Sequence, residues 1–62
     1  MTLQEFRKNG FPTGKEFFVE DKSFWVDKSR NGRYFNSYIG GRQVTRATAS
    51  TICKLIEAEV RK

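Results

Sequence analysis

The chain has 62 residues, 37% of them hydrophobic and 15% aromatic, and 12 Lys and Arg against 7 Asp and Glu give it a net charge of +5. This length allows one domain at most, and the aromatic content indicates a folded domain rather than a disordered tail. The absence of His and the single Cys53 exclude an internal disulfide and the usual zinc sites, so we expect neither a metal nor another cofactor.

The composition also bears on compartment and chemistry. A small domain without disulfides is typical of a reducing compartment, and no apolar run is long enough to span a membrane or resembles a signal peptide. We therefore expect a cytoplasmic protein with no membrane partner. Because no His or other nucleophile–base arrangement is present, the sequence does not predict an enzyme.

A short helix is predicted within residues 1–14. Thr2 followed by Glu5 matches a capping box, and Asn9-Gly10 provides a left-handed end to the helix just before Pro12. A helix this short needs tertiary packing to persist.

Three antiparallel strands are predicted within residues 15–41. The first runs from Lys15 to Glu20, the second from Phe24 to Lys28, and the third ends at Gly40-Gly41. Each is bounded by turn-forming residues, as expected for a meander of hairpins.

The turns set the register of these strands. Asn31-Gly32 favours a two-residue type I′ turn, which places Trp25 opposite Tyr38. A tight turn at Asp21-Lys22 then places Phe18 opposite Trp25, so that three aromatic side chains line up across the sheet.

This register sorts the side chains onto two faces. The first is a core face: Phe17, Val19, Phe24, Val26, Phe35 and Ile39. The second combines aromatic and polar residues: Phe18, Glu20, Trp25, Asp27, Ser29, Tyr34, Asn36 and Tyr38. Two arrangements remain open for the second face: it is exposed, or the N-terminal segment folds back over it and covers Phe18 first.

A second helix is predicted over residues 45–61, capped by Thr45 or Thr48. Its apolar stripe, which includes Ile52 and Cys53, would pack on the core face of the sheet. The predicted fold is a single α+β domain, α-βββ-α, with a three-stranded sheet.

The excess of basic over acidic residues is concentrated between Lys28 and Lys54, where no Asp or Glu occurs. A positive hairpin tip beside aromatic and amide side chains is typical of a phosphate-binding surface. The candidate nucleic-acid-binding residues are Trp25, Lys28, Arg30, Arg33, Tyr34, Asn36, Arg42 and Arg46.

Three strands followed by one helix resemble the AP2-type DNA-binding domains and the arm-binding domains of phage integrases. The resemblance rests on Phe24–Lys28, on Asn31-Gly32-Arg33-Tyr34-Phe35 and on the helix from about Thr45, and it covers roughly Phe17 to Val60. It implies that the helix packs behind the sheet and that the exposed face enters the major groove. That role would fall on Trp25, Arg30, Arg33, Tyr34 and Asn36, while Asp27, Asn36 and Tyr38 stand at face positions without a basic side chain.

These patterns predict a small basic nucleic-acid-binding protein, with duplex DNA as the first choice, acting as a regulator or accessory factor. The alternative is a phage-type interaction module or inhibitor that binds a host protein through Phe18, Trp25, Tyr34 and Tyr38. A third hypothesis is binding of RNA or single-stranded DNA by stacking on Trp25 and Tyr34.

Overall fold

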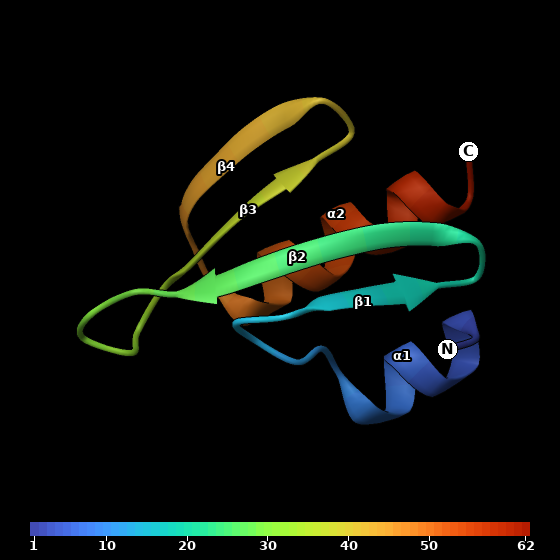
Figure 1. The fold of residues 1–62 in the computed structure, drawn as a ribbon, viewed down its shortest axis with the longest axis horizontal. Helices are drawn as coiled ribbons and strands as arrows, with labels where there is room; N and C mark the ends of the chain where they lie inside the picture. The colour runs from blue at the N-terminus through green and yellow to red at the C-terminus, as the bar shows by residue number, and fades with distance from the viewer.

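The computed structural model describes residues 1–62 as two helices and one four-stranded antiparallel sheet (Figure 1). In chain order the elements are α1 (Leu3–Asn9), β1 (Glu16–Val19), β2 (Lys22–Lys28), β3 (Phe35–Ile39), β4 (Arg42–Ala47) and α2 (Ala49–Val60). The α+β class and both helices are confirmed, whereas the three-stranded sheet is wrong because a fourth strand is present. Neither helix is long and apolar enough to cross a membrane.

The fourth strand lies where the sequence predicts a loop and the first turn of a helix. Gly40 and Gly41, with φ of 61° and 77°, form a two-residue turn that pairs Ile39 with Arg42. The glycines therefore connect two strands instead of ending the sheet. Helix α2 begins later than residue 45, because Thr48 is its N-cap and accepts a hydrogen bond from the Thr51 N–H at 3.3 Å.

The strand order β1-β2-β3-β4 follows the chain. The predicted pairing of β2 with β3 is confirmed, with Val26 opposite Ser37. The pairing of β1 with β2 is displaced by two residues, so that Trp25 lies opposite Glu16 and Phe18 opposite Ser23. A shift of two residues leaves every side chain on its predicted face, which is why the division into two faces survives the error.

The connection between β2 and β3 is a four-residue loop rather than a type I′ turn. Ser29 and Tyr34 close it through a backbone hydrogen bond of 2.8 Å, and the Gly32 N–H donates to the Ser29 carbonyl at 3.0 Å. A type I′ turn requires a positive φ at both central residues. Gly32 has a φ of 73°, but Asn31 does not have a positive φ.

One core lies between the sheet and the helices. It contains Phe6, Phe17, Val19, Phe24, Val26, Ile39, Ala47, Ile52 and Ile56. Phe35, predicted for the core face, is only half-buried and packs edge-to-face on Phe11, with ring centroids 5.3 Å apart. Cys53 packs against this core as predicted, and burial raises the pKa of its thiol.

The N-terminal segment joins this core instead of covering the second face. Phe6 is 2% exposed in the core, and Leu3 and Phe11 pack against it. The Met1 nitrogen donates to the Phe18 carbonyl at 2.7 Å, and the Glu20 N–H donates to the Met1 carbonyl at 2.7 Å, so this segment lines the free edge of β1. Phe18 itself remains 51% exposed.

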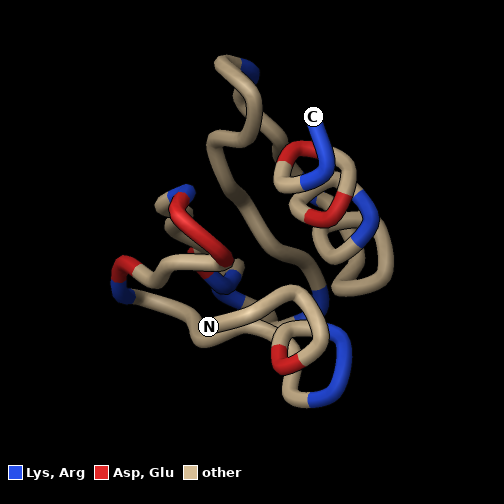
Figure 2. The backbone as a smooth tube through the Cα atoms, turned by 90° about the vertical axis from the view of Figure 1, so that its right-hand side faces the viewer, with Lys and Arg blue, Asp and Glu red and all other residues tan.

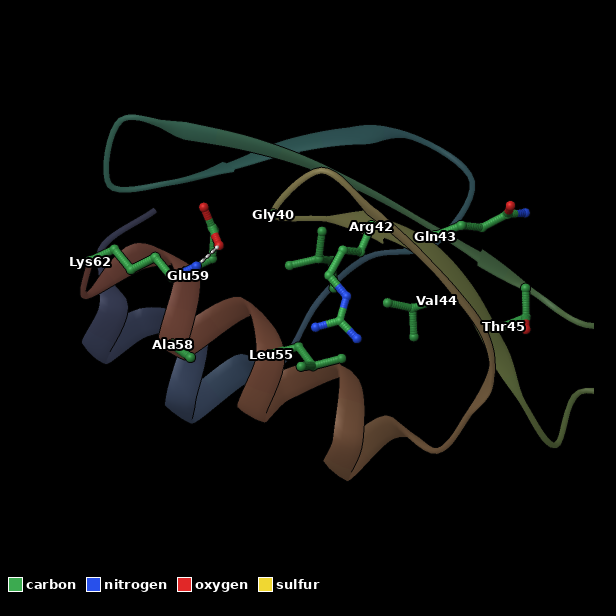
Figure 3. Close-up of a pocket in the computed structure, with 10 residues that line it drawn as sticks. Gly40, Arg42, Gln43, Val44, Thr45, Leu55, Ala58, Glu59 and Lys62 are labelled. Atoms are coloured by element: carbon green, nitrogen blue, oxygen red, sulfur yellow. Dashed lines mark ion pairs between the residues drawn. The ribbon is translucent and has the colours of Figure 1, made fainter.

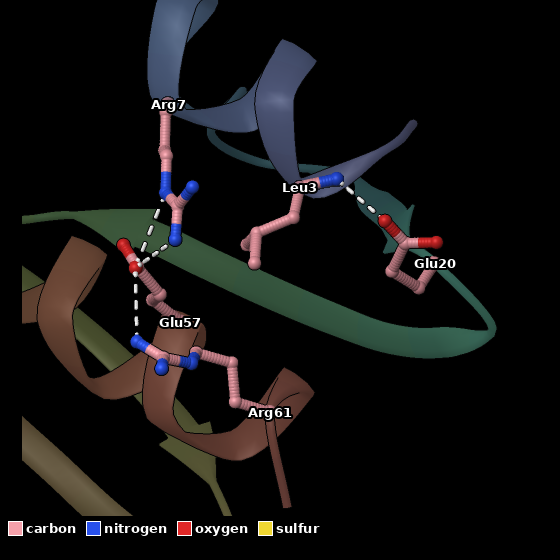
Figure 4. Close-up of polar contacts among 5 residues, drawn as sticks. All are labelled: Leu3, Arg7, Glu20, Glu57 and Arg61. Carbon is pink, nitrogen blue, oxygen red and sulfur yellow. Dashed lines mark hydrogen bonds and ion pairs between the residues drawn. The ribbon is translucent and has the colours of Figure 1, made fainter.

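An ion pair between Arg7 and Glu57 holds α1 against α2 (Figure 4). The Arg7 guanidinium donates twice to the Glu57 carboxylate, and Arg61 lies 3.8 Å from the same oxygen. The hydrogen bond from Arg7 lowers the pKa of Glu57, because it favours the ionised carboxylate.

Candidate nucleic-acid interface

The tip of the β2–β3 hairpin is held in shape by its own polar side chains. The Asn31 carboxamide oxygen accepts hydrogen bonds from the Ser29 hydroxyl at 2.7 Å and from the Arg33 N–H at 3.0 Å. The Ser29 hydroxyl oxygen in turn accepts the Tyr34 N–H at 3.2 Å. These bonds fix the backbone that carries Arg30 and Arg33, so both guanidinium groups project from a preorganised loop.

Three predicted site residues come together beside this loop. Arg30 and Tyr34 of the tip and Arg46 of β4 line one shallow hollow, together with Ser29 and Asn31. No acidic side chain lines it. Tyr34 is 39% exposed, so its ring is accessible in a hollow that two cationic side chains also line. We call Arg30, Arg33, Tyr34 and Arg46 the tip cluster.

A backbone irregularity brings Arg46 to the tip. The β3–β4 ladder shifts register between Phe35 and Ser37, and Arg46 adopts a left-handed φ of 53°. Its N–H donates to the Asn36 carboxamide oxygen at 3.1 Å. Asn36 therefore supports the irregular strand with its oxygen, and its amide nitrogen remains free to donate to a ligand. Its role in hydrogen-bond readout of bases stays a prediction.

Lys28 lies beneath the loop at the end of β2. A Cβ on Gly32 would lie 3.3 Å from the Lys28 Cε, so the lysine stem runs along the inner side of the tip. Its ammonium group adds positive charge near Gly32 of the tip without lining the hollow itself.

The charges of the basic segment are available to a ligand. None of its basic residues forms an ion pair: Lys28, Arg30, Arg33, Arg42, Arg46 and Lys54. The ion pairs of the protein involve the α2 acids Glu57 and Glu59, and Figure 2 shows acidic and basic positions side by side near the C-terminus. An arginine without a protein partner keeps its charge and its planar hydrogen-bonding fork for phosphate.

Trp25 lies apart from the tip cluster, on the second face of the sheet, which we call the open face. It is 47% exposed, and Tyr38 and Phe18 on the same face are 67% and 51% exposed. The indole N–H of Trp25 donates to the Asp27 carboxylate at 2.8 Å, which fixes the ring orientation. Glu16 lies directly opposite Trp25 on β1, so acidic groups flank this aromatic surface.

Arg42 is also separate from the tip. It stands at the opposite end of β4, beside Gly40, and lines a groove between β4 and α2 (Figure 3). Of the eight predicted site residues, the structure thus gathers Arg30, Tyr34 and Arg46 in one hollow, with Lys28 and Arg33 on the same hairpin tip. Trp25 and Asn36 line a second hollow, on the open face, and Arg42 lies apart from both.

Sequence reasoning missed Ser29 and Asn31 as parts of this site. Both line the hollow and hold the loop that carries the arginines. The signal was present, because Ser and Asn flanking an Arg before Gly are typical of side-chain-stabilised turns. Reading Asn31-Gly32 as a two-residue turn hid it.

Comparison of the sequence with models of known protein families gave no match, and comparisons with curated proteins and with solved structures gave none either.

Proposed function

We propose that this protein binds nucleic acid, with duplex DNA as the preferred ligand, and that the tip cluster provides the phosphate contacts. The observation that carries the proposal is the convergence of Arg30, Tyr34 and Arg46 on one hollow without an acidic neighbour. Arginines free of ion pairs neutralise phosphates and release the counterions condensed on DNA, which is the main source of affinity in such complexes.

The shape of the hairpin supports a duplex ligand. The β2–β3 loop projects beyond both helices as a narrow two-stranded ribbon (Figure 1). A ribbon of this kind fits the major groove of B-DNA, which is about 12 Å wide. In this arrangement Arg33 and Lys28 approach the groove with the tip, while Arg46 contacts the flanking backbone.

The proposed contact differs from the one implied by the AP2-type resemblance. There the whole open face would enter the groove, but Glu16 and Asp27 place carboxylates on that face beside Trp25. Carboxylates facing phosphates are repelled. We therefore propose that the tip and the β4 flank bind, and that the open face stays outside the groove.

A salt titration of binding to random-sequence duplex tests this proposal. If Arg30, Arg33 and Arg46 each neutralise one phosphate, affinity falls about 40-fold between about 50 and about 200 mM salt, at a slope of about −0.9 per phosphate. Replacing any one of them with Ala divides this fold-decrease in affinity by about 3.5. Lys8→Ala is the matched control, because it removes a charge that is also free of ion pairs but lies on α1.

Fluorescence separates contact by the tip from contact by the open face. Trp25 is the sole tryptophan and is half-exposed, so iodide quenches it in the free protein. It remains quenchable in the DNA complex if the tip binds, and becomes protected if the open face enters the groove. Absence of duplex binding at low salt, with the fold intact by circular dichroism, refutes the proposal.

A second candidate function is protein binding through the open face. The observation in its favour is the exposure of Phe18, Trp25 and Tyr38 on one uncovered surface with Asp27 and Glu16 beside them. This chemistry suits a partner that presents basic groups next to apolar ones. For such a partner Trp25→Ala weakens binding by at least about 30-fold and Arg46→Ala leaves it unchanged, the reverse of the order expected for DNA.

A further inference from the structure

The two edges of the sheet differ in how they are covered. The edge of β1 is paired with Met1 through two backbone hydrogen bonds of 2.7 Å. The edge of β4 has no strand beyond it. An uncovered edge presents backbone donors and acceptors that an extended chain can pair with.

A groove runs beneath this free edge, between β4 and α2 (Figure 3). Its volume is about 430 Å³, enough for a few side chains. Ile39, Val44, Leu55 and Ala58 give it an apolar lining, and Leu55 is 36% exposed. Apolar side chains of a strand added to β4 would be buried here, because alternate residues of a strand point to the same face.

Arg42 provides a charged group at one end of the groove. Figure 3 shows its guanidinium extending over the groove toward Leu55. Arg42 forms no ion pair, and Lys62 also lines the groove. The acid present, Glu59, is already paired with Lys22 and Lys62, at 3.8 and 3.3 Å. The free charge in the groove is therefore a cation that needs an anionic partner.

The charges of β4 also decide which occupant fits. The strand carries Arg42 and Arg46 and no acidic residue, so pairing with β4 of a second copy would bring like charges together. A nucleic acid has no apolar side chains to fill a lining of Val44 and Leu55. An extended peptide whose groove-facing side chains are apolar except for one carboxylate opposite Arg42 satisfies the edge, the groove and the cation together.

We propose that β4 and this groove form a second binding site, which takes an extended acidic peptide segment of a partner protein as a fifth strand. The peptide backbone pairs with β4, its apolar side chains pack on Val44 and Leu55, and a carboxylate pairs with Arg42. The groove involves residues 42–45 of β4 and not Arg46, so a peptide paired with that end of the strand leaves the tip cluster open.

Binding of a synthetic ten-residue peptide tests the proposal by NMR titration; Thr occupies every second position, and the groove-facing positions between carry Val and one Glu. We expect amide shift changes and slowed hydrogen exchange at Gln43 and Thr45, with changes at Leu55. A peptide with Lys in place of Glu, and one with Pro in place of the central Thr, are the matched controls. The first loses the pairing of charges and the second loses a backbone donor.

Charge reversal makes the test specific. Arg42→Glu should weaken the acidic peptide at least about fivefold and strengthen the Lys peptide, with duplex DNA binding unchanged. A C-terminally amidated peptide that binds equally well assigns the anion to a side chain, and one that fails assigns it to the terminal carboxylate. Absence of shift changes at millimolar peptide, shift changes confined to Trp25 and Tyr38, or equal binding of both peptides would overturn the proposal.

Discussion

Replacing Arg46 with Gly should stabilise the protein while weakening its binding to DNA. Arg46 is exposed and holds a left-handed φ of 53°. This conformation costs a residue with a Cβ about 1–2 kcal/mol, and Gly avoids the cost. Gly also loses more backbone entropy on folding, which destabilises the protein by about 0.5–1 kcal/mol and offsets part of this gain. The net stabilisation is about 0.5–1 kcal/mol, or roughly 2–8 °C in Tm for a domain of this size.

Arg42→Gly is the matched control for this change. Arg42 is on the same strand, is exposed and carries the same charge, but its φ is not positive. Gly at this position has a lower propensity for a β-strand and relieves no backbone strain, so we expect the free energy of unfolding to fall by about 0.5–1 kcal/mol. The two variants have the same net charge and should shift Tm in opposite directions.

Thermal unfolding by circular dichroism and the salt titration together decide the matter. Arg46→Gly should raise Tm and flatten the salt slope by about 0.9, whereas Arg42→Gly should lower Tm and leave the slope unchanged. A Tm for Arg46→Gly at or below that of the wild type would refute the argument from strain. An equal flattening of the slope by both variants would refute the placement of Arg46, and not Arg42, at the phosphate contact.

Two further predictions concern stability. The Arg7–Glu57 pair should make the wild type more stable to unfolding than Arg7→Gln, by an amount that depends on pH. Because Arg7 lowers the pKa of Glu57, this difference in stability is complete above about pH 4.3, the ordinary Glu value, and is lost as the pH falls through the lowered pKa. Urea unfolding at several pH values measures it. An advantage that persists unchanged at lower pH would contradict this assignment. Gly40→Ala and Gly41→Ala should each lower the stability by about 1–2 kcal/mol, because Ala must adopt a left-handed conformation. Gly40→Ala should cost up to about 1 kcal/mol more, because its Cβ would lie 2.6 Å from the Glu59 carboxylate and would displace it from Lys22 and Lys62. The extra cost should vanish in a Glu59→Ala background, and its persistence there would place the conflict elsewhere.

Alternation of side chains made the two faces of the sheet predictable. Phe24 and Val26 point to the core while Trp25 points outward, as the period of two requires. The same period made the turn error at Asp21-Lys22 harmless to the faces, because the register moved by two residues. The register shift did change the candidate site, because it placed Glu16 rather than Phe18 opposite Trp25.

The fourth strand carried a weak signal. Of its residues only Val44 and Ala47 are apolar, and the register shift near Arg46 breaks their alternation. Gly40-Gly41 is compatible both with a strand end and with a hairpin turn, and local sequence does not distinguish these. The position of Arg46 beside Arg30 depends on that irregular strand and on the Asn36 hydrogen bond, so it could not be deduced from spacing along the chain.

The meander order of the sheet has a consequence for how the chain folds. Each strand pairs with the next one along the chain, so every hairpin closes a short loop at small entropic cost. The contacts of largest sequence separation join α1 to α2, as between Arg7 and Glu57, 50 residues apart. We expect the hairpins to form early and α1 to dock late, so that loss of the Phe6 side chain speeds unfolding in stopped-flow measurements while leaving the folding rate nearly unchanged.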